Sequence, residues 1–121
     1  MAMLTDDDKK FILNAVLKQI VHMSDKEYQK RMWIKGAGPD FDEAVCQFFD
    51  IIDPVLEKHK NFNISDVNYK FLVKFRNAFK AFSDDNDYPE EFIESTEWKK
   101  IMEMAKEVLK VFNYTDRGKT L

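Results

Sequence analysis

The hexapeptide Lys35-Gly36-Ala37-Gly38-Pro39-Asp40 separates two stretches of sequence that otherwise have a continuous helical pattern. It contains two of the three glycines and one of the three prolines of the 121-residue chain. Glycine enters left-handed backbone regions at little cost, and proline fixes φ while removing a hydrogen-bond donor. We therefore expect a loop of defined shape here, which ends one helix, precedes the next and can form part of a binding surface.

The composition predicts one domain with a packed helical core. A chain of 14.4 kDa can bury a core without a metal ion or a disulfide. Its 45% hydrophobic and 34% charged residues argue against intrinsic disorder. Eleven phenylalanines with only three glycines favour helices over sheet, because a sheet protein needs more turn residues. We expect a single helical domain over residues 1–121, with a frayed polar tail over residues 113–121.

Apolar periodicity and capping residues predict an all-α bundle of five or six helices. Thr5 followed by three aspartates starts a first helix that should end near Met23. Ser24 and Glu27 match a capping box for a second helix over residues 25–35, which Gly36 should terminate. The apolar residues expected on one side of the first helix are Phe11, Ile12, Ala15, Val16, Ile20 and Val21.

The sequence after the glycine-rich loop predicts the remaining helices. Asp40 caps a third helix, which should be kinked or broken near Asp50 because Pro54 removes a backbone hydrogen bond. A fourth helix begins at Ser65, and a short one begins at Pro89. The inner faces expected for the fourth and last helices comprise Phe71, Leu72, Phe75, Phe79 and Phe82, and Trp98, Ile101, Met102, Ala105, Val108, Leu109 and Phe112.

Cysteine usage and the N-terminal sequence favour a cytoplasmic protein. Cys46 is the single cysteine and has no internal disulfide partner, so we expect a buried, inert thiol in a reducing compartment. The acidic N-terminus lacks the basic and apolar regions of a signal peptide. No uncharged apolar run approaches the about 20 residues that span a bilayer. A net charge of -3 gives no overall field that favours nucleic acid, so neither nucleic acid nor membrane is an expected partner.

The sequence contains no recognisable catalytic or cofactor-binding motif. His22 and His59 lack the spacing of paired metal ligands, and Cys46 has no positioned histidine to activate it. Lys35-Gly36-Ala37-Gly38 lacks the preceding strand that a phosphate loop requires. We therefore expect no catalytic residue, no metal site and no cofactor, and a function other than enzymatic catalysis.

The segment over residues 84–97 is strongly acidic, with seven carboxylates and no lysine or arginine. Helix dipoles account for some of these acids, and a solvated loop is one interpretation. A calcium loop is disfavoured because Pro89 and Ser95 occupy the positions of its glycine and glutamate. The other interpretation is an acidic surface for a basic partner. A second acidic stripe is expected on the third helix, at Glu43, Asp50, Asp53 and Glu57.

These features leave two hypotheses for function. The first is a protein-interaction module that binds a basic partner, such as a toxin nuclease; the alternative is an apolar ligand pocket between the third and fourth helices. The small, acidic, helical chain is similar to bacterial immunity proteins, which neutralise nuclease-type toxins; this analogy of fold and charge assigns no residue. The sequence does not indicate an oligomeric state. The candidate partner-binding residues are Trp33, Lys35, Gly36, Gly38, Asp40, Asp42, Glu43, Asp84, Asp85, Asp87, Tyr88 and Glu91.

Overall fold

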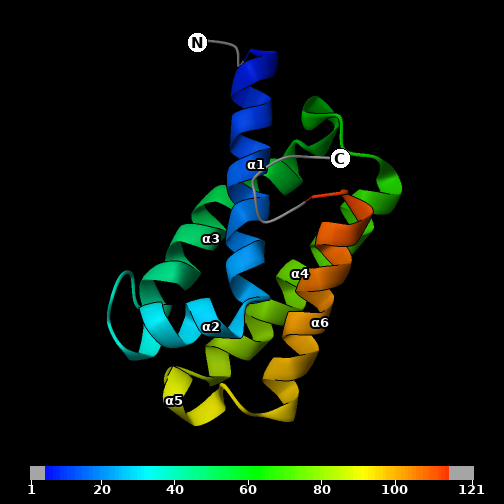
Figure 1. Cartoon of the computed structure of the whole chain (residues 1–121). Helices are drawn as coiled ribbons and strands as arrows, with labels where there is room; N and C mark the ends of the chain where they lie inside the picture. The colour runs from blue at the N-terminus through cyan, green and yellow to red at the C-terminus, as the bar shows by residue number, and fades with distance from the viewer. Residues whose placement is uncertain (1–4, 115–121) are drawn as a thin grey trace.

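The computed structural model describes residues 5–114, which form an all-α bundle (Figure 1). The four long helices are α1 (Asp6–Met23), α3 (Phe41–Glu57), α4 (Asp66–Asp85) and α6 (Thr96–Val111). The short elements are α2 (Lys26–Gln29), the π-helical turn η1 (Lys30–Ile34), the 3-10 turn η2 (His59–Phe62) and α5 (Pro89–Phe92). The six α-helices of the described residues confirm the predicted fold class, an all-α single-domain bundle.

The four long helices enclose one hydrophobic core, and α2 and α5 lie at one end of it (Figure 1). α1 packs against α3 and α6, and α4 packs against the same two helices. Between α3 and α4 the space is filled by the rings of Phe48, Phe75 and Phe79, whose centroids are 5.5 to 6.0 Å apart. All three side chains are fully buried. The predicted inner faces of α4 and α6 are largely confirmed, with Phe71, Leu109 and Phe112 half-buried and the rest buried.

The start of α1 is confirmed, but one residue assigned to its apolar side is not. Thr5 Oγ1 accepts a hydrogen bond from the Asp8 amide at 3.0 Å, and the Asp8 carboxylate accepts one from the Thr5 amide at 3.1 Å. Phe11, however, is 76% exposed, whereas Ile20 is fully buried. At 100° per residue, Phe11 lies about 180° from Ile20 around the helix axis. The apolar residues of α1 surround more of the helix than the core can cover.

The second helical segment differs from the prediction at its start and in its hydrogen bonding. Ser24 belongs to the end of α1, where its hydroxyl donates to the Val21 carbonyl at 2.8 Å. The N-cap of α2 is Asp25, whose Oδ1 accepts from the Tyr28 amide at 3.2 Å. After Gln29 the helix widens into the π-helical turn η1, which ends at residue 34, directly before Lys35. The segment ends ahead of the glycine-rich loop, as predicted.

Pro54 does not break α3, which continues to Glu57. The proline lacks the amide that would donate to the carbonyl of Asp50, an exposed residue, so this carbonyl can be hydrated. Ile52 and Val55, on either side of Pro54, are fully buried. Burial of this apolar face outweighs the loss of one hydrogen bond, so the helix is not broken near Asp50, while the kink stays a prediction.

Cys46 is exposed, so the expectation of a buried thiol is also wrong. It lies two residues before Phe48, which is fully buried, and two helical positions differ by about 200° around the axis. The tail expected from Asn113 lies mostly outside the described residues. Tyr114, which is described, is buried, and its hydroxyl donates to the Asn14 carbonyl at 3.4 Å. Within residues 5–114, no helix has both the length and the apolar character needed to cross a membrane.

Gln29 is a polar residue that is fully buried in the core. Its Nε2 donates to the backbone carbonyl of His22 at 3.0 Å, and its Oε1 accepts from the indole Nε1 of Trp98 at 2.9 Å. One side chain thereby connects the end of α1, the end of α2 and the first turn of α6. The His22 carbonyl and the Trp98 indole N–H are polar groups, and burying either without a hydrogen bond costs free energy.

We expect Gln29→Ala to lower the free energy of unfolding by about 2–4 kcal/mol, because it leaves two buried polar groups unpaired and creates a cavity. The control is Gln47→Ala, which truncates an exposed glutamine of α3 and should change stability by less than about 0.5 kcal/mol. Denaturation by urea, followed by tryptophan fluorescence and circular dichroism, measures both. Equal unfolding midpoints for the two variants would show that the Gln29 link contributes nothing.

Candidate functional site

The two segments singled out in the sequence lie at the same end of the bundle (Figure 1). Phe41, the first residue of α3, follows the glycine-rich loop and is buried. Its ring contacts Trp33, which precedes the loop, at a centroid distance of 5.1 Å, and Phe92 of α5 at 4.9 Å. Residues more than 50 positions apart in the chain are thus fixed side by side by a row of aromatic rings.

The loop has the defined shape that its composition predicts. Gly36 has a φ of +76°, in the left-handed region that favours glycine. The Lys35 amide donates to the Lys30 carbonyl at 2.9 Å, and the Ala37 amide donates to the Arg31 carbonyl at 3.1 Å. At Gly38 a Cβ atom would lie only 2.5 Å from the Met32 sulfur, so this side chain packs directly on the loop backbone.

Three of the candidate carboxylates have roles at the start of α3. Asp40 is its N-cap, and its Oδ1 accepts a hydrogen bond from the Glu43 amide at 2.9 Å. Asp42 and Glu43 lie exposed in the first turn, where the helix dipole favours negative charge. Lys35, Gly36 and Gly38 are also exposed. Helix capping accounts for Asp40, whereas the other side chains are open to solvent.

Trp33 belongs to the core and not to the exposed surface. Only 7% of it is exposed, and its ring contacts those of Phe41 and Trp98, with the Trp98 centroid at 5.8 Å. The exposed apolar side chain next to the loop is instead Ile34, which is 39% exposed. The sequence alone does not decide between Trp33 and Ile34, because adjacent apolar residues of a helix can both be buried, as Val16 and Leu17 are.

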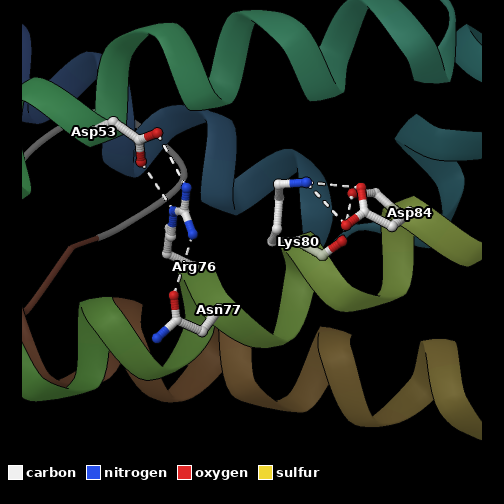
Figure 2. Close-up of polar contacts among 6 residues, drawn as sticks. Asp53, Arg76, Asn77, Lys80 and Asp84 are labelled. Carbon is white, nitrogen blue, oxygen red and sulfur yellow. Dashed lines mark hydrogen bonds and ion pairs between the residues drawn. The ribbon is translucent and has the colours of Figure 1, made fainter.

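The acidic segment contains both paired and open carboxylates. Asp84 is held by Lys80, one helical turn earlier, at 2.8 Å (Figure 2). Glu94 lies 3.2 Å from Lys26 and 3.9 Å from Lys30, which ties this segment to α2 and η1.

Asp85, Asp87 and Glu91 are exposed, and no ion pair joins any of these three to another residue in the described range 5–114. Tyr88 lies among them in sequence and is 59% exposed. The segment therefore presents an exposed aromatic ring and three open acids within seven positions of the sequence.

The acidic stripe expected on α3 is not entirely open. Asp53 receives hydrogen bonds from Nε and Nη2 of Arg76 on α4, at 2.9 and 3.1 Å (Figure 2). This bidentate pair raises the pKa of the Arg76 guanidinium, mainly through the hydrogen bond to Asp53. The guanidinium also lies 5.1 Å from the ring centroid of Phe49. Asp53 thus connects α3 to α4, while Glu43, Asp50 and Glu57 stay exposed.

A small pocket lies behind the glycine-rich loop, between the ends of α1 and α2 and the first half of α3. Its volume is about 40 Å³, and its lining includes His22, Tyr28, Trp33 and Pro39. Pockets that hold drug-sized ligands have volumes of about 300–1,000 Å³. Within residues 5–114, no group of three or more His, Cys, Asp or Glu side chains is placed to hold a metal ion.

Comparison of the chain with protein-family models, with curated proteins and with solved structures finds no match in any of the three.

His22, which lines this pocket, is a group whose charge depends on pH. Its ring stacks on Tyr28 with the centroids 3.8 Å apart. Burial lowers the pKa of the His22 imidazole below its ordinary 6.5, and the charge of Lys18 lowers it further, while Asp25 acts in the opposite direction. Burial also raises the pKa of the Tyr28 hydroxyl, against the smaller effect of Arg31.

We expect the stability contributed by a neutral His22 to be complete above pH 6.5 and to be lost as the pH falls through its folded pKa. Between those two values the unfolded chain binds more protons, so the free energy of unfolding decreases with decreasing pH. His22→Gln should reduce this decrease. Urea denaturation at a series of pH values measures how the free energy of unfolding changes with pH. The same change with pH in the variant and the wild type would contradict its assignment to His22.

We also expect Gly36→Ala to lower the free energy of unfolding by about 1–2 kcal/mol, because an L-residue is strained at this φ. No atom lies within 4 Å of the added Cβ, so strain and not collision causes the loss. Gly36→Asn should cost less, since asparagine tolerates the left-handed region. Thermal and urea unfolding compare the two variants, and an alanine variant as stable as the wild type would show that the loop adopts another shape.

Proposed function

We propose that this protein is a non-enzymatic interaction module that binds a basic protein through one end of its bundle. We call this surface the acidic end and define it by the exposed residues Ile34, Asp42, Glu43, Asp85, Asp87, Tyr88 and Glu91. The observation that carries the proposal is one short segment with the exposed ring of Tyr88 and three exposed carboxylates, Asp85, Asp87 and Glu91, that form no ion pair within residues 5–114.

The chemistry of this surface suits a partner rich in arginine and lysine. Tyrosine is enriched at the energetic centres of protein interfaces because it buries a large rigid ring and offers a hydroxyl. Carboxylates around such a ring attract cations, speed diffusional encounter and disfavour acidic competitors. An arginine of the partner can stack on the Tyr88 ring and donate two hydrogen bonds to Asp85 or Asp87.

The residues beneath the acidic end are packed together, which favours binding without rearrangement of this surface. The row formed by Trp33, Phe41 and Phe92 fixes the loop against α5. Glu94 holds the end of α5 to α2 through Lys26. A preorganised surface loses less conformational entropy on binding than a mobile one.

The class of partner that best suits these features is an enzyme that binds phosphate, such as a nuclease, because its substrate site is basic. An acidic protein that occupies such a site excludes the nucleic acid, and this would make the chain a small inhibitor of the immunity-protein kind. In this proposal the acidic end mimics the charge of the phosphates, and Tyr88 provides the apolar anchor.

Capture of a basic protein from the native cell lysate, with the immobilised chain at low and moderate salt, tests the proposal. We expect retention at low salt that weakens as ionic strength rises, because the attraction is between exposed charges. Asp85→Lys/Asp87→Lys should abolish capture, and Tyr88→Ala should weaken it about tenfold or more, as expected for a central anchor.

The matched control is Asp50→Lys/Glu57→Lys, which makes the same change in net charge on the outer side of α3. It should retain the partner at moderate salt. Equal loss of capture in both double variants would indicate general electrostatic attraction instead of a defined surface. No retained protein, with all variants folded by circular dichroism, would refute the proposal.

A further inference from the structure

The outer face of α1 carries an exposed phenylalanine that the fold does not use. Phe11 is 76% exposed and lies on the opposite side of α1 from Ile20. The neighbouring positions of this face, Asn14 and Ala15, have short side chains and are half-buried, and Tyr114, whose hydroxyl donates to the Asn14 carbonyl, borders the face. An exposed ring beside small residues is suited to contact with another helix.

Charges of opposite sign stand at the two ends of this face. Asp7 lies one turn before Phe11, and Lys18 lies two turns after it. Both are exposed, and within residues 5–114 neither takes part in an ion pair. The outer face of α1 therefore has the order acid, aromatic ring, small residues and base.

We infer that a second copy of this chain docks on the outer face of α1, with the two α1 helices antiparallel. A two-fold axis midway between Phe11 and Asn14 brings Phe11 against Asn14 and Ala15 of the second copy. The same axis brings Asp7 against Lys18 of the second copy. Every contact then occurs twice, as a self-complementary interface requires.

The geometry of a regular helix fits this register. Phe11 and Asn14 are three residues apart, which offsets the two phenylalanine rings by about 4.5 Å along the axis and lets them pack side by side. Parallel helices would instead place Asp7 against Asp7 and Lys18 against Lys18. In the antiparallel arrangement the positive end of each helix dipole also lies near the negative end of the other, which is favourable. Charge complementarity thus selects a second copy in one orientation.

The interface is small, and it leaves the acidic end free. One helix face buries less than the about 1,200 Å² of a stable specific complex, so the dimer forms at high concentration. The N-terminal half of α1 lies at the opposite end of the bundle from α5 (Figure 1). The dimer consequently presents two acidic ends, one on each copy.

Sedimentation equilibrium of the full chain from micromolar to millimolar concentration tests the inference. We expect the average mass to rise from 14.4 kDa toward twice this value. Phe11→Ala should weaken association about tenfold or more, the effect of removing a central anchor. The matched control is Val67→Ala, which truncates another exposed apolar side chain, on α4, and should leave association unchanged.

A charge exchange tests the orientation. Lys18→Glu should weaken the dimer because it opposes Asp7 with a second acid, and Asp7→Lys/Lys18→Glu should restore it. A mass of 14.4 kDa at every concentration would overturn the inference. Association that is insensitive to Phe11→Ala, or that the charge exchange does not restore, would overturn it as well. The four substituted side chains, Asp7, Phe11, Lys18 and Val67, are all exposed, so circular dichroism should show each variant folded like the wild type.

Discussion

Burial of Trp98 is the constraint on which the rest of this structure depends. Its fully buried ring contacts rings from η1, α3, α4 and α5, with centroid distances between 5.1 and 6.3 Å. The indole N–H must find an acceptor in this apolar surrounding, and Gln29 provides it. Hydrophobic packing and one buried hydrogen bond thus set the position of α2 and η1 relative to the four long helices.

The same packing positions the acidic end. The loop and α5 contribute few buried residues of their own, so their places depend on Phe41 and Phe92, which pack against Trp98. α4 ends at Asp85 and α5 begins at Pro89, and Asp85, Asp87 and Glu91 in this part of the chain are exposed. The exposed charges are a consequence of where the apolar anchors lie, and they can change without removing a core contact.

The sequence predicts the elements well where apolar spacing and caps agree, as in α4 and α6. It fails where too many apolar residues compete for one face. In α1, Phe11 and Ile20 both suit a helix, and only the packing of the other helices decides which is buried. Gln29 could not be recognised, because its role requires a tryptophan 69 positions later. Of the candidate site, the loop shape and the open acids could be predicted, whereas the burial of Trp33 depends on contacts between distant segments.

Both proposed contact surfaces of this protein contain an aromatic residue that lies outside the core. The bundle buries most of its phenylalanines and its two tryptophans in one cluster, and burial of such a ring contributes about 1.5–3 kcal/mol. Phe11 and Tyr88 are exposed and do not contribute this burial free energy in the isolated chain. Each has charged residues near it in the sequence that form no ion pair within residues 5–114, an acid and a base for Phe11 and only acids for Tyr88. A face with both signs can pair with itself, while a face with one sign requires a partner of the other. The charge pattern near each ring therefore distinguishes the proposed self-association through α1 from the proposed binding of a basic protein at the acidic end.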